Sequence, residues 1–186
     1  MAWRDDLGAS MDVFNRLIKP VLEIVMHGDY IPVEGSPEEI AQLLDRRIGI
    51  DAMVDQGDII YGLGSRIQID SGVWNTFTVR CDRESGHITE LEKLRKAIRS
   101  DSMRPQGTLQ AYVENDELKS LGLARTADII KYIDTHACPE RRSYDGIRWA
   151  KFKVVHWDKL KAAGFEVCVL DGRSCQNLVS RKAVSR

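Results

Sequence analysis

Polar and apolar residues alternate through much of the chain between Gly49 and Tyr112. Residues two apart in a strand share a face, so this alternation predicts strands with one apolar and one polar side. We expect these strands near residues 48–54, 59–69, 76–81 and 108–113. Their polar faces carry Asp51 on the first; Arg66, Gln68 and Asp70 on the second; Thr76, Thr78 and Arg80 on the third; and Thr108, Gln110 and Tyr112 on the fourth. If these faces coincide in space, they form one polar site.

Helices are predicted before and between these strands. Apolar residues at helical spacing indicate a helix over residues 10–25, with a kink or break at Pro20. Two further helices, over residues 36–46 and 89–99, begin with a hydroxyl cap that is followed three residues later by a glutamate. The remaining elements expected in this half are an extended segment at residues 30–33 and a tight hairpin turn at residues 55–58.

The C-terminal part of the chain adds further elements to the same domain. A strand at residues 118–124 should pair with the strand at 108–113, and Thr126 should cap a helix that runs to about His136. The elements expected after it are a polar loop at 138–146, a strand at 151–156, a helix at 158–163, a strand at 165–170 and a frayed tail over 173–186. We therefore expect one α+β domain over residues 1–172, with a C-terminal strand-helix-strand extension.

Composition narrows the class of protein. With 186 residues, 43% of them hydrophobic, the chain can bury a sizeable core. Its net charge of −1 gives no global basic field of the kind that attracts nucleic acids, although basic residues can still cluster locally. The four cysteines lack CxxC spacing and paired histidines, which disfavours zinc and indicates reduced thiols in a cytoplasmic protein. No apolar run approaches the roughly 20 residues of a membrane span.

The order of elements from about residue 37 to 113 is helix, three antiparallel strands, helix, strand. Together with the motif Gly49-Ile50-Asp51-Ala52, this αβββαβ order resembles the PD-(D/E)XK nuclease superfamily, to which many restriction endonucleases and Holliday-junction resolvases belong. The resemblance implies a restriction-endonuclease-like core with a mixed sheet, Mg²⁺ as cofactor and DNA as partner. It places Asp51 in the position of the acid on the first hairpin strand.

The second hairpin strand departs from the pattern of that superfamily. Where an acid-x-Lys pair is expected, this chain has Arg66 and Gln68. Gln68 stands in the place of the lysine, but a guanidinium group in the place of the acid cannot bind a metal. The superfamily lets catalytic groups migrate to the following helix, where Glu90 and Lys93 lie three residues apart.

The predicted site assigns each of these residues a role. Asp51 and Glu90 are the candidate metal ligands, and Glu34, Glu38 or Glu39 could add a further acid. Lys93 would activate water or stabilise charge. The candidates for contacting the phosphate or orienting the ligands are Arg66, Arg80, Gln68 and Gln110, and Trp74 is a further candidate substrate contact.

Other interpretations remain open at this stage. Asp51 could form an ordinary cross-strand ion pair with Arg66 or Arg80 on a solvated sheet face, and Glu90 and Lys93 could be surface residues of a helix. The function is then one of three: a metal-dependent DNA nuclease of a defence or mobile-element context, an inactive nucleic-acid-binding or protein-interaction module on the same fold, or a domain whose arginines bind a small anion. Analogy with nuclease folds of this size suggests a homodimer.

Overall fold

The computed structural model describes residues 11–33, 41, 44, 48–144 and 148–184, with side chains through residue 180. Its helical elements are the π-helical turn η1 (Phe14–Ile18) and the α-helices α2 (Lys19–Met26), α4 (Glu90–Arg99), α5 (Thr126–Thr135), α6 (Trp157–Ala162) and α7 (Gly172–Val184). Its strands are β1 (Asp29–Pro32), β2 (Ala52–Asp55), β3 (Ile60–Ile69), β4 (Thr76–Arg83), β5 (Gly107–Glu114), β6 (Glu117–Arg125), β7 (Glu140–Tyr144), β8 (Trp149–His156) and β9 (Val167–Asp171). None of the helices in this described part of the chain is both long and apolar enough to cross a membrane.

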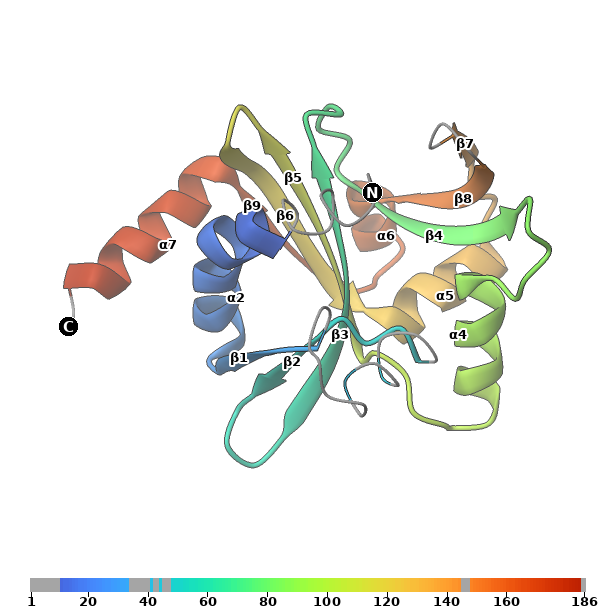
Figure 1. Cartoon of the computed structure of the whole chain (residues 1–186), viewed down its shortest axis with the longest axis horizontal. Helices are drawn as coiled ribbons and strands as arrows, with labels where there is room; N and C mark the ends of the chain where they lie inside the picture. The colour runs from blue at the N-terminus through green and yellow to red at the C-terminus, as the bar shows by residue number, and fades with distance from the viewer. Residues whose placement is uncertain (1–10, 34–40, 42–43, 45–47, 145–147, 185–186) are drawn as a thin grey trace.

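The strands form two sheets. The larger has six strands in the order β1-β2-β3-β5-β6-β9, and the smaller has three in the order β4-β8-β7. The β3–β5 pair is parallel and the other pairs of the larger sheet are antiparallel, which makes that sheet mixed. Helices α2 and α7 lie on one side of the larger sheet, and the smaller sheet lies on the other side with α4 and α5 (Figure 1). The predicted α+β class with a mixed sheet is therefore confirmed.

Each face of the larger sheet contributes to a separate hydrophobic cluster. The cluster on the side of α2 and α7 includes Ile18, Leu22, Val54, Leu109, Leu121 and Cys175, and the cluster on the opposite side includes Phe77, Leu91, Tyr112, Ile129, Val155 and Trp157. Gly122 of β6 allows the Trp157 ring to pack directly on the backbone, because a Cβ atom at this position would lie only 2.4 Å from the ring. Alternate residues of β5 enter opposite clusters, so both faces of this strand are buried.

Several local predictions are confirmed. The β2–β3 hairpin forms, β5 and β6 pair antiparallel, and α4 begins with the expected capping box of Thr89 and Glu92. At the predicted kink or break near Pro20 the chain stays helical from residue 11 to 26 and changes from the π-helical turn η1 to α2. Proline has no N–H to donate to the carbonyl four residues earlier, and a wider turn accommodates this loss. The helix expected over residues 36–46 lies outside the described residues except for Ala41 and Leu44.

The third strand of the predicted antiparallel triple is in a different sheet. β4 does not pair with β3; it pairs antiparallel with β8, while the edge of β3 is taken by the parallel strand β5. Between β3 and β4 the chain adopts positive φ at Asp70, Gly72 and Asn75, which turns it away from the larger sheet. Because each strand edge accepts one partner, β5 excludes β4 from pairing with β3.

The C-terminal predictions need four corrections. Residues Glu140–Tyr144, expected within a loop, form β7, whose polar composition suits an edge strand. The expected strand-helix-strand unit is divided, because β8 lies in the smaller sheet and β9 in the larger. Thr126 is the first residue of α5 and not its cap; Arg125 is the N-cap residue and makes no side-chain capping bond. The tail predicted to be frayed forms α7 over Gly172–Val184, and its Cys175 is buried against the sheet.

Candidate functional site

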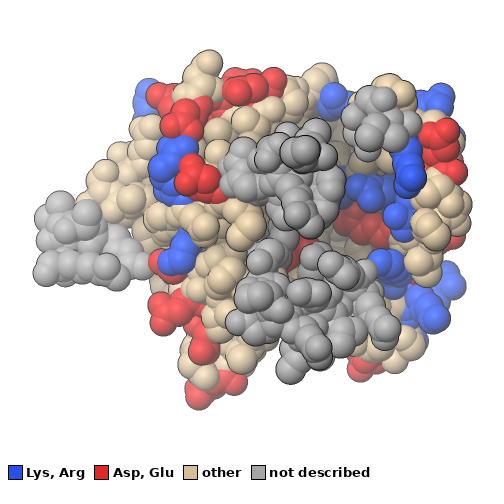
Figure 2. Space-filling view, viewed as in Figure 1, with Lys and Arg blue, Asp and Glu red and all other residues tan. Residues whose placement is uncertain are grey.

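A cavity of about 350 Å³ lies between β3, β4 and the start of α4. It is lined by Ile48, Gly49, Asp51, Gly64, Ser65, Arg66, Thr78, Arg80, Arg83, Glu90, Lys93, Leu94, Pro105 and Thr108. In the space-filling view, Lys and Arg atoms surround Asp and Glu atoms in a recess on the right half of the molecule (Figure 2). The structure thus brings together five predicted site residues, namely Asp51, Arg66, Arg80, Glu90 and Lys93.

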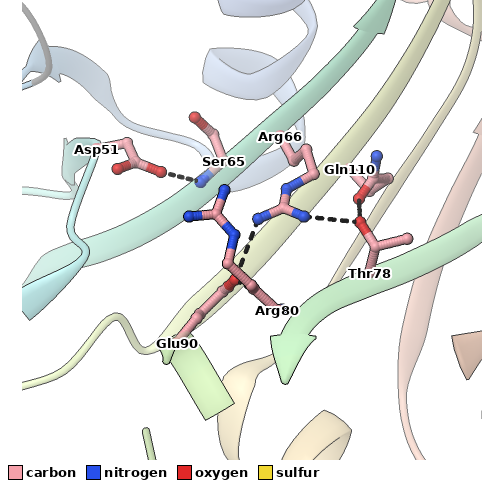
Figure 3. Close-up of polar contacts among 7 residues, drawn as sticks. All are labelled: Asp51, Ser65, Arg66, Thr78, Arg80, Glu90 and Gln110. Carbon is pink, nitrogen blue, oxygen red and sulfur yellow. Dashed lines mark hydrogen bonds and ion pairs between the residues drawn. The ribbon is translucent and has the colours of Figure 1, made fainter. Parts of the chain in front are cut away.

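Asp51 is held at the point where the chain enters β2. Its backbone N–H donates to the carbonyl of Leu63 at 2.8 Å, and its carbonyl accepts from the N–H of Val33 at 3.2 Å. Its side-chain Oδ2 accepts a hydrogen bond from the backbone N–H of Ser65 at 2.6 Å (Figure 3). The predicted parity is confirmed here, because the neighbouring Ile50 and Ala52 are buried in the core while Asp51 lines the cavity.

Glu90 is the first residue of α4 and joins that helix to both sheets. Its Oε2 accepts from Nη2 of Arg66 at 3.0 Å and from the backbone N–H of Arg80 at 3.1 Å. The capping box of Thr89 and Glu92 fixes the helix start and thereby the position of the Glu90 side chain. Glu90 is therefore part of a network that spans three elements, and not an isolated acid on a helix surface.

Arg66 is held from several directions. Besides Glu90, it donates from Nη1 to Oγ1 of Thr78 at 3.1 Å, and Thr78 in turn donates to Oε1 of Gln110 at 3.2 Å. These groups are drawn in Figure 3. The Phe152 ring of β8 lies 4.9 Å from the guanidinium carbon of Arg66 and 5.5 Å from that of Arg80, so both cations pack on one aromatic ring.

Two residues beside the cavity are not among those that the sequence predicts for the site. Arg83, at the end of β4, lines the cavity and donates to the backbone carbonyls of His87 and Ile88. Phe152 is the register partner of Arg80 across β4 and β8. The alternation in β8 marks Phe152 as facing one side of a strand, but only the pairing of β8 with β4 brings it beside the site.

The remaining predicted site residues lie outside the cavity lining. Gln110 is fully buried behind it and is linked to it through Thr78. Gln68 is half-buried further along β3. Trp74 lies in the β3–β4 connection, half exposed, with the guanidinium of Arg141 above its ring. Glu34, Glu38 and Glu39, the candidates for an additional acid, lie outside the described residues.

The charges that line the cavity favour an anion. Among the residues that the structure describes, four cationic side chains, those of Arg66, Arg80, Arg83 and Lys93, line the cavity with two carboxylates, those of Asp51 and Glu90. Arginine offers donors in a fork that matches two phosphate oxygens, so this set is suited to a phosphate group.

The carboxylates described in the cavity are too few to bind a metal ion without further ligands. In the described ranges, no three His, Cys, Asp or Glu side chains gather closely enough to hold a metal ion by themselves. Mg²⁺, however, is commonly bound by one or two carboxylates together with water and substrate phosphate oxygens. Asp51 and Glu90 in one cavity meet that lesser requirement.

Comparisons of the chain with protein-family models, with curated proteins and with solved structures found no match. The protein is accordingly classed by its own features: an α+β fold with a mixed six-stranded sheet and a cavity of arginines, a lysine and two carboxylates between its two sheets.

Proposed function

We propose that this chain is a metal-dependent nuclease that hydrolyses phosphodiester bonds in DNA, on a core related to that of the PD-(D/E)XK superfamily. The observation that carries the proposal is the position of Asp51, Glu90 and Lys93 in the lining of one cavity, together with Arg66 and Arg80. The core in this proposal comprises β2, β3, α4 and β5, and β4 approaches it from the second sheet.

Each side chain has a defined part in this proposal. Asp51 and Glu90 would hold Mg²⁺, which when bound polarises a phosphoryl oxygen and lowers the pKa of a bound water. Arg66 and Arg80 donate to the phosphate oxygens and orient the phosphodiester. Lys93 balances the negative charge that grows on the phosphate as it is attacked. Gln110, through Thr78, keeps the Arg66 guanidinium in position.

A second candidate function is DNA binding without cleavage. The ion pair of Arg66 with Glu90 favours this second function, because the pair occupies a carboxylate oxygen that a metal would need. A binding module needs the arginines and has no use for a metal ligand.

Cleavage assays on supercoiled plasmid and on branched oligonucleotides, with Mg²⁺ or Mn²⁺ and with EDTA, test the proposal. We expect metal-dependent cleavage that falls by about 100-fold or more in Asp51→Asn and in Glu90→Gln, since even the loss of an outer-shell partner costs 10–100-fold. Asp101→Asn is the matched control, because Asp101 is an exposed acid just after α4 that lies outside the cavity lining.

The outcomes separate the two candidates. Salt-sensitive DNA binding that needs Arg66 and Arg80, with no cleavage in either metal, would establish the binding module. A protein that neither binds nor cleaves DNA at low salt would exclude both functions.

A further inference from the structure

The face of the smaller sheet that borders the cavity carries a row of cationic and aromatic side chains. Arg80 of β4 lies opposite Phe152 of β8, and Phe152 lies opposite Arg141 of β7. Residues directly opposite each other on neighbouring strands share a face of the sheet. The Arg141 guanidinium carbon lies 4.7 Å from the centroid of the Trp74 ring. The row therefore leads from the cavity across the whole smaller sheet, whose place beside β3 is visible in Figure 1.

Trp74 presents an aromatic ring to solvent in a fixed orientation. The residue is 51% exposed, and its indole N–H donates to the carbonyl of Ser71 at 2.9 Å. The indole also packs on Gly72, which has a φ of +87° and where a Cβ atom would lie 3.2 Å from Nε1 of Trp74. A large ring that is both exposed and held in place loses little freedom when a planar ligand stacks on it.

Arg141 supplies a positive charge beside that ring. In the described part of the chain, no carboxylate forms an ion pair with Arg141, whereas the neighbouring Lys151 and Lys153 pair with Asp82 and Glu140. A guanidinium that stacks on an aromatic ring keeps its N–H donors in its own plane, where they can reach a phosphate. Arg141 and Trp74 together thus offer one phosphate contact and one stacking surface.

We infer that this Arg141–Trp74 pair binds an unpaired nucleotide of the DNA substrate, close to the phosphate held in the cavity. Two strand spacings separate the backbones of Arg141 and Arg80, about 10 Å, which corresponds to about three stacked nucleotide steps of one strand. Bases in a duplex are already stacked and paired, so only an unpaired base can reach the Trp74 ring. The substrate class is then DNA with a single-stranded segment beside the cleaved bond. This inference rests on the proposed function of the cavity.

Fluorescence anisotropy in EDTA, with a labelled single-stranded oligonucleotide and with the blunt duplex of the same sequence, tests the inference. Trp74→Ala should bind the single strand at least about fivefold more weakly, the lower end of the loss expected for one base–aromatic stack. Its affinity for the duplex should stay unchanged. Trp74→Phe should retain most of the single-strand affinity, because phenylalanine also offers a ring for stacking.

A matched control is available on the same strand. Arg142 lies next to Arg141 but faces the other side of the sheet, where its guanidinium carbon is 4.7 Å from the Trp149 ring centroid. We expect Arg141→Gln to weaken single-strand binding and Arg142→Gln to leave it unchanged. Equal losses in these two variants would indicate a general charge effect and would overturn the inference.

The remaining outcomes separate this inference from the proposed function. If Trp74→Ala binds the single strand as the parent does, or loses affinity for both probes alike, the inference is overturned while metal-dependent cleavage still stands. If the parent protein binds neither probe, the inference is overturned, and the cleavage assays with Mg²⁺ or Mn²⁺ decide the proposed function separately. Far-UV circular dichroism of each variant confirms that it is folded.

Discussion

Replacing Gln110 by methionine should stabilise the protein while it weakens the site. The Gln110 side chain is 0% exposed, and its Oε1 accepts from the Thr78 hydroxyl at 3.2 Å. Its Nε2 has no hydrogen-bond partner among the residues that the structure describes. A buried polar group without a partner costs about 1–3 kcal/mol. Methionine is unbranched, of similar length and adaptable in shape, so it fills the same space without that cost.

The expected gain is smaller than the whole cost of the buried amide. The substitution also removes the hydrogen bond from Thr78 to Gln110, which contributes about 1 kcal/mol. We therefore expect the free energy of unfolding to rise by about 1 kcal/mol, and the melting temperature by about 2–4 °C for a chain of this size. Because Thr78 loses the partner that orients its hydroxyl toward Arg66, DNA binding should weaken, though by less than in Arg66→Ala.

Urea unfolding followed by circular dichroism measures this change. Gln106→Met is the control for the loss of a glutamine hydrogen bond without a buried orphan group, since Gln106 is exposed and its Oε1 accepts from the backbone N–H of Gly62 at 2.6 Å. The control should lower the free energy of unfolding by about 1 kcal/mol. If Gln110→Met is instead destabilised by as much as the control, Nε2 has a partner in solution and the reasoning is refuted.

Two further predictions concern titratable groups away from the cavity. The hydrogen bond from the backbone N–H of Thr89 holds the pKa of Glu92 below its ordinary value of 4.5. Ionised Glu92 therefore stabilises the folded protein above about pH 4.5. This contribution is lost as the pH falls through the lower pKa that Glu92 has in the folded state. Urea unfolding should show a difference between the parent and Glu92→Gln at pH 7 that disappears in acid; a difference that persists in acid would contradict this. Burial raises the pKa of the Cys175 thiol to about 11, so Ellman's reagent at pH 8 should label exposed Cys168 in the native protein and Cys175 only after unfolding. Equal labelling rates would show that α7 does not pack on the sheet.

The elements that the sequence predicts correctly are those whose signals are local. Thr89 and Glu92 mark the start of α4 within four residues, and the alternation around Asp51 places Ile50 and Ala52 in the core. Strand partners are not local: nothing near residues 76–83 indicates that β4 pairs with β8, which lies far along the chain. The order of the described elements, three strands, a helix and a strand, is thus predicted correctly along the chain, while the sheet in which the third strand lies is not.

The same distinction explains which site residues were found. Parity predicts the face of a strand on which a side chain lies, and this was enough to select Asp51, Arg66 and Arg80. The alternation along a strand does not predict how deeply a side chain is buried. Gln110 shares the polar face of its strand, yet it is fully buried because β4 of the second sheet packs over it. Phe152 carries no polar signal, and its part in the site follows only from its pairing with Arg80.

The ion pair between Arg66 and Glu90 is the point at which the two candidate functions diverge. A phosphate that enters the cavity competes with Glu90 for the Arg66 guanidinium, since both offer oxygen acceptors to the same donors. In a nuclease, the exchange of Arg66 to the phosphate removes one of the two donors on Glu90 Oε2, and Asp51 and Glu90 would then hold the metal, so DNA and Mg²⁺ each strengthen the binding of the other. Linkage requires this coupling to be equal in both directions. In a binding module, Glu90 keeps the N–H of Arg80 and gains no metal, so the affinity for DNA is independent of a specific Mg²⁺ site.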